Sequence, residues 1–357
     1  MRPVLGLSSY LSFMDRLELT VTDIIQETRN ARTFVLEPER EQNLSYQAGQ
    51  FITFIFERHG QELRRSYSFS STPRVDPFHS ITVKRVANGE FSRFFTDKVE
   101  IDQQLLALGP SGRFTLEMSQ ERSRQIFFIA AGSGIVPVYS LIKQVIHDEP
   151  YTRIQLIYQN HSQKEVIFAR QLANLAHARP TQFRLISLIT DTAHGTDSKK
   201  LNIPLLEILV RRELLESQEH LFFLCGPASF MRMAQFTLRW MGFPEESIRR
   251  ENFTVMPFQP PAPEIFDPGP KNLLLHYKGN IIKLEAAAGK NILQAALDRG
   301  IELPFSCRTG VCSTCAAKCL RGQVKMSNNE VLTESDLQAG LVLTCVGYAE
   351  TDVELVF

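Results

Sequence analysis

The spacing of the cysteines constrains this chain more than any other feature. Four of the six cysteines in 357 residues fall within residues 307–319, CRTGVCSTCAAKC, and Cys345 follows Cys315 after twenty-nine intervening residues. Six cysteines are too few for a disulfide framework in a chain of this length, and their clustering indicates metal or redox chemistry in a reducing compartment. We therefore expect a cytoplasmic protein with one compact loop of thiolate ligands.

The loop has the spacing C-x4-C-x2-C, with a fourth cysteine far away in the sequence. This pattern is typical of a plant-type [2Fe–2S] site, in which four thiolates hold two irons. Gly310 and the small residues around it suit a backbone that wraps closely around the cluster. Structural zinc remains an alternative, although four-cysteine zinc sites usually use two separated C-x2-C pairs. We predict as ligands Cys307, Cys312, Cys315 and Cys345.

The remaining cysteine of the loop, Cys319, lies in AAKCLRGQVKM, which has the pattern of a strand leaving the loop. We expect it to be a small buried residue and not a ligand. The segments IELPFSCRTGVCSTC and GQVKMSNNEVLTESDLQAGLVLTCVGY resemble a plant-type ferredoxin domain over its whole length. The resemblance implies a β-grasp fold, with a hairpin, a helix and late strands.

Charge separates this segment from free plant-type ferredoxins, which are typically very acidic. Residues 272–357 hold eight Lys and Arg against nine Asp and Glu. An electron donor on the same chain supplies a high effective concentration, so long-range electrostatic steering is less necessary.

The overall composition excludes several classes of partner. Thirty-nine basic and thirty-nine acidic residues give a formal net charge of zero, which offers no electrostatic footprint for nucleic acid. The longest weakly polar stretch, residues 127–142, is interrupted by Gly, Ser and Pro, which argues against a membrane span. Residues 1–13 lack the small-residue cleavage site of a signal peptide, so we expect none.

Prolines mark the clearest boundary in the chain. Residues 256–270, MPFQPPAPEIFDPGP, contain six prolines and predict a semi-rigid linker. Short alternating segments in residues 15–120 indicate an antiparallel β-barrel. In residues 121–255, continuous apolar strands alternate with helical stretches, which predicts an α/β domain with a parallel sheet. Residues 271–357 form a third, α+β domain that contains the cysteines.

Two motifs in the first domain carry chemistry. RRSYSFSS at 64–71 presents Arg65, Tyr67 and Ser68 in an R-x-Y-S arrangement. Together they offer a guanidinium for a diphosphate, an aromatic face for an isoalloxazine ring and a hydroxyl near the reactive N5 of a flavin. Gly89 and Ser92 then form a G-x-x-S turn before a predicted helix, where backbone N–H groups suit a phosphate. An ordinary strand and a capped helix are the alternatives.

Together these motifs resemble the FAD domain of the ferredoxin–NADP⁺ reductase superfamily. The resemblance implies that the R-x-Y-S residues contact FAD and that the later turn holds its pyrophosphate. The residues that we expect to bind FAD are Arg65, Tyr67, Ser68, Phe69, Val83, Lys84, Gly89, Phe91 and Ser92.

A buried strand, IFFIAA, is followed by Gly132, Gly134 and Pro137. Glycine at a strand-to-helix turn lets the backbone approach a pyrophosphate. Proline replaces the third glycine of the Rossmann fingerprint, and no acidic residue ends the next strand, where the sequence is Tyr158–His161. The motif instead resembles the G-x-G-x-x-P of the same superfamily, which implies that all three residues bind the nicotinamide dinucleotide.

The second dinucleotide signature, Cys225–Gly226–Pro227, follows the strand HLFFL. A cysteine at a strand end is ordinarily a packing residue. In the superfamily this motif lies where nicotinamide meets flavin, which implies that all three residues bind the cofactor and that Cys225 is catalytic together with Ser68. The segment Glu251–Phe253 ends the domain, and the resemblance implies that Phe253 covers the other face of the flavin.

The order of the motifs covers nearly the whole chain and places the ferredoxin last, as in the reductase components of bacterial phenylacetyl-CoA epoxidases and their relatives. NAD(P)H gives up two electrons as hydride and a [2Fe–2S] cluster accepts one at a time, so a flavin must stand between them. We expect an NAD(P)H-dependent oxidoreductase that passes electrons to an outside one-electron acceptor, an oxygenase or a di-iron enzyme, with the phenylacetyl-CoA epoxidase complex as first choice.

Several alternatives stay open at this point. The partner is alternatively a fatty-acid desaturase or another hydroxylase, or the chain is a redox-sensing module without sustained turnover. A zinc-stabilised protein with vestigial motifs is the third possibility. For the nicotinamide, His161 stands where relatives carry an Arg that meets a 2′-phosphate, which favours NADH, while Lys164 and Arg232 leave NADPH possible.

Overall fold

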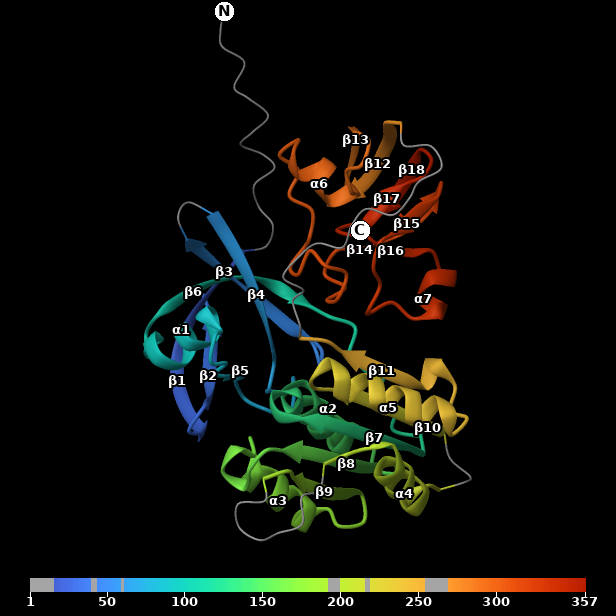
Figure 1. Cartoon of the computed structure of the whole chain (residues 1–357). Coiled ribbons are helices and arrows are strands. Elements are labelled where there is room, and N and C mark those ends of the chain that lie inside the picture. Colours follow the sequence, from blue (N-terminus) through green and yellow to red (C-terminus); the bar gives the residue numbers. More distant parts are fainter. Residues whose placement is uncertain (1–15, 40–43, 59–60, 192–199, 216–218, 254–268) are drawn as a thin grey trace, which may run out of the picture. The chain divides into compact units, whose positions relative to one another are not determined.

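The computed structural model describes residues 16–39, 44–58, 61–191, 200–215, 219–253 and 269–357. The chain forms two compact units, one of them Leu17–Asn252 and the other containing Phe253–Phe357 (Figure 1). Residues 1–13, where we expect no signal peptide, and all but the last two residues of the predicted proline-rich linker lie outside the described residues.

The first unit begins with a six-stranded antiparallel sheet in the order β4-β3-β6-β1-β2-β5. An isolated bridge from Phe69 to Ile81 joins the two edge strands, so the sheet curls into a barrel. These strands are predicted by alternating apolar and polar residues, and their apolar side chains fill the barrel with aromatic rings. Phe95 packs edge-on against Phe34 and Phe54. The elements are β1 (Arg16–Thr28), β2 (Ala31–Pro38), β3 (Phe51–Arg58), β4 (Gln61–Ser68), β5 (His79–Lys84), α1 (Glu90–Lys98) and β6 (Gln104–Ser111).

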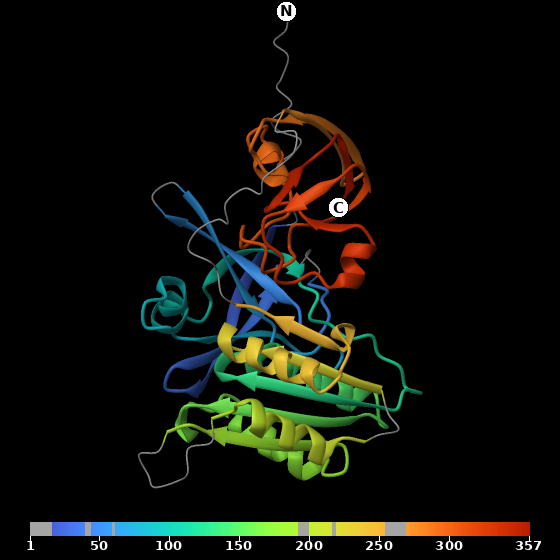
Figure 2. The same cartoon turned by 45° about the vertical axis from the view of Figure 1, so that its right-hand side comes forward.

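The second half of this unit is a parallel five-stranded sheet in the order β11-β10-β7-β8-β9. Figure 2 shows helices on both of its faces. The chain runs outward from β7 through β8 to β9 and then crosses back to β10, so a switch point lies between β7 and β10. The strands are β7 (Arg124–Ala131), β8 (Arg153–Asn160), β9 (Phe183–Ile189), β10 (Glu219–Cys225) and β11 (Ile248–Glu251), and the α-helices are α2 (Ile135–Asp148), α3 (Ala169–Ala178), α4 (Ile203–Glu213) and α5 (Ala228–Trp240).

Every residue of β7 is buried, because the central strand of this sheet has helices on both faces. One apolar core lies against α2 and α3, and another against α4 and α5. The barrel and the parallel sheet are joined by buried hydrogen bonds: the Thr72 hydroxyl donates to the carbonyl oxygen of Ser140 at 2.8 Å, and the Ser140 hydroxyl donates to that of Ser71 at 2.6 Å.

The second unit is built around a five-stranded mixed sheet in the order β13-β12-β18-β14-β16. β12 and β13 form the predicted hairpin, and β18 pairs parallel to β12 at the centre of the sheet. The elements are β12 (Lys271–Tyr277), β13 (Asn280–Ala286), α6 (Ile292–Leu297), β14 (Ala316–Arg321), β15 (Val324–Met326), α7 (Glu334–Gln338), β16 (Leu341–Leu343), β17 (Gly347–Ala349) and β18 (Val353–Val356). The predicted fold classes, a barrel, a parallel α/β sheet and a β-grasp domain, are confirmed.

No helix within the described ranges is long and apolar enough to cross a membrane.

Candidate functional site

The strand β4, which lies at one edge of the barrel sheet, carries the R-x-Y-S residues. The guanidinium of Arg65 lies 4.5 Å from the centre of the Phe91 ring, a cation–π arrangement that orients its N–H donors. Tyr67 packs edge-on against Phe95 with ring centres 4.9 Å apart, and burial raises the pKa of its hydroxyl, which keeps the group neutral. The hydroxyl oxygen of Ser68 is buried and has no hydrogen-bond partner among the residues that the structure describes.

The neighbouring residues of this set have different surroundings. Phe69 and Val83 are fully buried in the barrel core, so they shape the site without polar chemistry. Lys84, at the end of β5, lies 3.1 Å from the Glu165 carboxylate on the parallel-sheet side of the unit. Its ammonium group is also 3.8 Å from where a Cβ of Gly132 would stand, which brings a positive charge beside the glycine turn.

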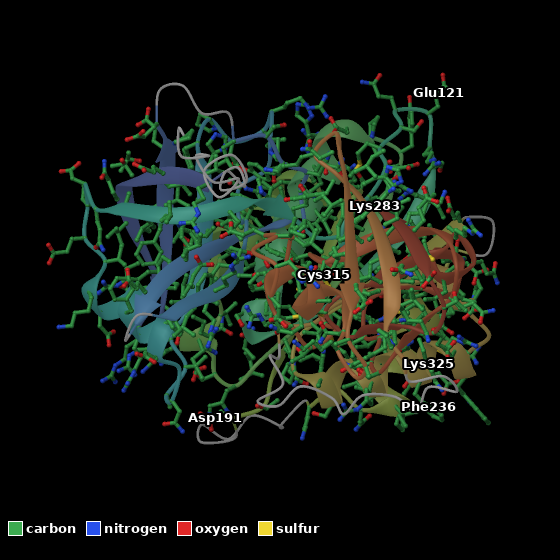
Figure 3. All side chains as sticks on the ribbon, turned by 90° about the horizontal axis from the view of Figure 1, so that it is seen from above. Glu121, Asp191, Phe236, Lys283, Cys315 and Lys325 are labelled. Carbon is green, nitrogen blue, oxygen red and sulfur yellow. The ribbon has the colours of Figure 1, made fainter. Side chains whose placement is uncertain are left out.

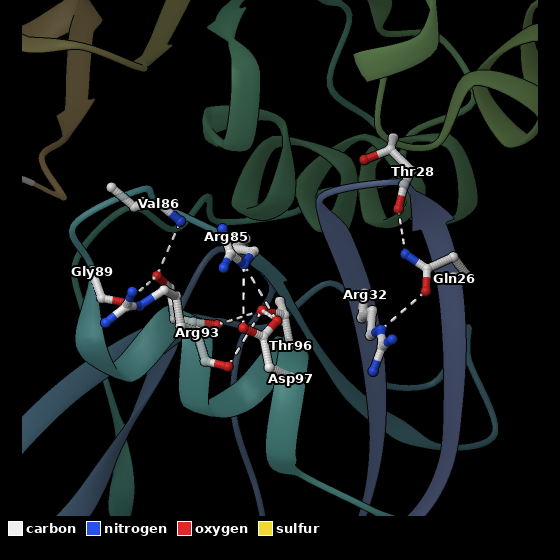
Figure 4. Close-up of polar contacts among 10 residues, drawn as sticks. Gln26, Thr28, Arg32, Arg85, Val86, Gly89, Arg93, Thr96 and Asp97 are labelled. Carbon is white, nitrogen blue, oxygen red and sulfur yellow. Dashed lines mark hydrogen bonds and ion pairs between the residues drawn. The ribbon is translucent and has the colours of Figure 1, made fainter.

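The turn before α1 is closed by the side chain of Ser92, which links Val86 to Gly89, both labelled in Figure 4. The Ser92 hydroxyl accepts a hydrogen bond from the N–H of Val86 and donates one to the carbonyl oxygen of Gly89, both at 3.0 Å. A Cβ at Gly89 would stand 2.5 Å from this hydroxyl, so a larger residue there would displace the Ser92 side chain. Ser92 therefore shapes the turn. The groups of this turn that suit a phosphate are the backbone N–H groups at the start of α1.

The two dinucleotide motifs meet at the switch point of the parallel sheet. Gly132–Gly134 form a single 3-10 turn after β7, and Pro137 lies in the first turn of α2. A Cβ at Gly134 would stand 2.1 Å from the carbonyl oxygen of Cys225 and 2.8 Å from the nitrogen of Gly226. Pro227 then precedes the first residue of α5. The two backbones touch without intervening side chains, which leaves a smooth surface of peptide groups at the strand ends.

The end of β8 supports this turn. The hydroxyl of Tyr158 lies beside the Asn160 side chain but donates its hydrogen bond to the carbonyl oxygen of Gly132, 3.0 Å away. Both polar atoms of the Asn160 amide are buried without a hydrogen-bond partner. An amide with two buried unpaired atoms beside the glycine turn is suited to bind a polar ligand there.

The sequence motifs assign no role to Glu251, which begins the segment Glu251–Phe253 at the end of the domain. In the structure, Glu251 pairs in register with Cys225 and is 8 % exposed. Burial raises the pKa of this carboxyl to about 8, and burial together with Glu251 raises the pKa of the Cys225 thiol. Burial thus favours the neutral form of both groups, and the acid can hold a proton beside the Cys–Gly–Pro motif.

Phe253 follows β11 in the sequence and belongs to the second compact unit. Its ring is 43 % exposed. An exposed aromatic ring is available to cover a planar ligand, and its predicted contact with flavin stays a prediction.

The second unit brings the four predicted cysteine ligands together. The Cys307 thiol contacts those of Cys312 and Cys345, and Cys345 also contacts Cys315. The sulfur of Cys307 accepts hydrogen bonds from the N–H groups of Thr309 at 3.4 Å and Val311 at 3.5 Å. These thiol and backbone contacts hold the pKa of Cys307 below its ordinary value.

The loop is held from outside by the segment after β15. A Cβ at Gly310, whose φ is +80°, would stand 2.9 Å from the carbonyl oxygen of Asn328. The Asn328 amide donates to the carbonyl oxygen of Thr309 at 2.7 Å. Figure 3 labels Cys315, which is buried in this unit, together with Lys283 and Lys325, whose side chains are exposed.

Cys319 differs in part from its prediction. It lies on β14, as expected, but it is half-buried rather than buried, and its thiol donates to the carbonyl oxygen of Arg321 at 3.3 Å. The expectation of a buried residue is wrong because β14 leaves the core soon after Ala317, and Lys318 and Leu320 are exposed on either side. Its thiol is absent from the contacts that join the other four cysteines of this unit.

The side chains fit the cofactors that the motifs imply. In the described part of the chain, buried side-chain N and O atoms without a partner occur in only four residues, Ser68, Asn160, Glu302 and Thr309. Buried polar groups are normally paired, so such groups point to ligands. Three of the four lie in the regions predicted for flavin, dinucleotide and cluster, and nothing in the structure explains Glu302. Among the described residues, no three His, Cys, Asp or Glu side chains are arranged to hold a single metal ion.

Comparison with known families decides the identity. An oxidoreductase FAD-binding domain matches residues 18–116, an oxidoreductase NAD-binding domain matches 128–235, and a 2Fe-2S iron-sulfur cluster binding domain matches 275–350. The ferredoxin reductase component of 3-ketosteroid-9-alpha-monooxygenase from Mycolicibacterium smegmatis is 32 % identical over 342 residues, 92 % of this chain and 93 % of that protein. The chain belongs to the iron–sulfur flavoprotein reductases.

Other relatives also match this reductase over nearly their whole length. A component of 1,2-phenylacetyl-CoA epoxidase from Escherichia coli is 32 % identical over 337 residues, 92 % of this chain and 93 % of that protein. Phthalate dioxygenase reductase shares the fold at a TM-score of 0.58 and 21 % identity, covering 96 % of this chain and 97 % of that one. The reductase is an electron-transfer oxidoreductase with FAD-binding, NAD-binding and [2Fe–2S] domains, and its predicted superfamily is confirmed.

Proposed function

We propose that this reductase oxidises NAD(P)H and delivers the electrons one at a time, through FAD and a [2Fe–2S] cluster, to an oxygenase component. The observation that carries the proposal is the presence in one chain of all three domain types that this electron path requires. Bound FAD supplies the conversion of one hydride into single electrons.

The residues of the chain bind, orient and shield. We assign the FAD to the end of β4 and the turn before α1, with the Arg65 guanidinium on the diphosphate and the unpaired Ser68 hydroxyl toward the isoalloxazine. The touching backbones of Gly134 and Cys225 form the nicotinamide surface. The cluster ligands are Cys307, Cys312, Cys315 and Cys345.

A phenylacetyl-CoA epoxidase is the partner that we place first. The matching epoxidase component from Escherichia coli aligns with the reductase over nearly its whole length, and the domain order is the one expected for that group. The steroid monooxygenase reductase is equally similar, so another hydroxylase is the second candidate. Reductases of glycine betaine monooxygenase are more distant, at 28 % identity.

Reconstitution distinguishes these partners. The purified reductase, with NADH, is combined in separate reactions with the oxygenase components of phenylacetyl-CoA epoxidase and of 3-ketosteroid-9-alpha-monooxygenase, and product is measured by mass spectrometry. We expect epoxide formation in the first reaction, at a rate at least tenfold above the second. If product formed only with the steroid monooxygenase, the epoxidase would be rejected as the partner and the second candidate would take its place.

A prior assay tests the reductase activity itself. We expect the flavin-loaded and cluster-loaded protein to reduce ferricyanide and cytochrome c in the steady state with a nicotinamide donor. A protein that carries both cofactors and reduces neither acceptor is not a reductase and fits the redox-sensing alternative.

For the donor, we propose NADH. His161 follows the unpaired amide of Asn160, and its ring lies 3.5 Å from the hydroxyl of Thr190. This position lacks the guanidinium that would hold a 2′-phosphate. Comparison of kcat/KM for NADH and NADPH tests the choice, and His161→Arg is expected to shift the ratio toward NADPH.

A further inference from the structure

One side chain of the cysteine loop has a group that nothing in the described part of the protein satisfies. Thr309 is 3 % exposed and stands between Cys307 and Gly310. Its N–H donates to the sulfur of Cys307 at 3.4 Å, and its carbonyl oxygen accepts from the Asn328 amide at 2.7 Å. Both backbone groups are therefore fixed, but the hydroxyl is buried and has no partner.

Other threonine hydroxyls around the loop are paired. The Thr344 hydroxyl donates to the carbonyl oxygen of Cys315 at 3.0 Å, and that of Thr314 lies 3.4 Å from the sulfur of Cys312. A buried hydroxyl normally finds an acceptor, and the acceptors that belong to this loop but are not part of the polypeptide are the sulfides of the cluster. The backbone contacts of Thr309 hold the residue beside Cys307, the first ligand.

We propose that the Thr309 hydroxyl donates a hydrogen bond to a bridging sulfide of the cluster and raises the reduction potential of the cluster. The proposal rests on the proposed [2Fe–2S] site. One-electron reduction adds one negative charge to the iron–sulfur core, and a donor aimed at sulfur stabilises the more negative state. The electron is the one that the reductase already delivers, so the step needs no further reactant.

The test is a redox titration of the full-length protein, with the reduced cluster followed by electron paramagnetic resonance. Thr309→Val keeps the shape and removes the donor, whereas Thr309→Ser keeps the donor. At a fixed solution potential we expect the reduced-to-oxidised ratio to fall about tenfold in the valine variant, which corresponds to a shift of about 59 mV to lower potential. The serine variant is expected to titrate like the wild type.

Thr351→Val is the matched control, because the Thr351 hydroxyl accepts from the N–H of Gln323 in the same unit, away from the cysteine loop. It should leave the potential unchanged. A valine variant at Thr309 with the wild-type potential, or a serine variant that shifts as far as valine, overturns the proposal.

Iron and acid-labile sulfide are measured in each protein before titration. If Thr309→Val fails to hold the cluster, Thr309→Ala is titrated with the same expectation. Loss of the cluster in both variants, with retention in Thr309→Ser, means that the hydroxyl holds the loop rather than tunes it, and the proposal is then wrong. Absence of iron and sulfide from the wild type would instead overturn the proposed cluster site.

Discussion

A Cβ atom at Gly134 would lie 2.1 Å from the carbonyl oxygen of Cys225, a separation that no pair of such atoms tolerates. The glycine turn and the Cys–Gly–Pro turn are therefore a single packed structure. We expect Gly134→Ala to push them apart and to slow reduction of the flavin by NADH at least tenfold, with FAD still bound. Stopped-flow absorbance of the anaerobic protein measures the rate.

Gly109→Ala is the matched control for this change, since a Cβ at Gly109 meets nothing within 4 Å. It should leave the rate within about twofold of the wild type. An alanine at Gly134 with an unchanged rate would mean that the turn relaxes at no cost and that the close contact is not needed for binding.

The buried hydroxyl of Ser68 is expected to matter for hydride transfer. Without it, the flavin loses a hydrogen-bonding group at its reactive edge, so we expect Ser68→Ala to slow hydride transfer about tenfold to a hundredfold in single turnover. Ser66→Ala, on the same strand, removes a hydroxyl that pairs with Thr53 at 2.9 Å and should have little effect. Equal rates of hydride transfer in the two variants would show that Ser68 has no role in the reaction.

Glu251 gives the protein a specific pH dependence. Burial raises the pKa of its carboxyl from 4.5 to about 8, so the folded state keeps a proton that the unfolded state releases at lower pH. Its contribution to stability is fully present below about pH 4.5 and is lost as the pH rises toward 8. Glu251→Gln is neutral throughout, so its free energy of unfolding relative to wild type should rise between pH 5 and pH 8.5, by an amount on the order of a few kcal/mol. Urea denaturation across this pH range measures the difference.

Glu245→Gln is the control for pH, because Glu245 forms an ion pair with Arg239 in which both side chains are about half exposed. Its free energy of unfolding relative to wild type should not change with pH over the same range. A constant difference for Glu251→Gln as well would show that this carboxyl is ionised in the folded protein.

Two of the cysteines outside the C-x4-C-x2-C triplet, Cys345 and Cys319, have opposite expected outcomes. Cys345 is buried and its thiol contacts those of Cys307 and Cys315, so Cys345→Ser should abolish or greatly weaken the visible absorption of the cluster. Cys319→Ser, on β14, should keep it. Absorption spectra together with iron analysis decide the assignment, and the reverse result would require a different ligand set.

Local patterns were sufficient to predict much of the fold. Alternation predicted the barrel strands, and uninterrupted apolar runs predicted β7 and β10, because a strand with helices on both faces has no polar side. The motifs at Arg65, Gly132 and Cys225 lie at strand ends or turns, as their spacing requires. Each of these features is encoded within a few residues.

Features that depend on distant pairing could not be predicted. Glu251 is buried because β11 pairs with β10, and no local property of the segment reveals this pairing. The Arg124–Glu149 ion pair, in which both side chains are at most 1 % exposed, joins a strand to the residue after a helix. The exposure of Cys319 likewise follows from where β14 leaves the core of its unit.

The central position of β18 has a consequence for the order of events during synthesis. β14, which leaves the cysteine loop, pairs with β18, and β18 follows Cys345 in the sequence. On the ribosome, the first three ligands therefore emerge before the fourth ligand and before the strand that anchors their loop. The four cysteines accordingly come together only after translation of this domain, and until then their thiols are open to oxidation.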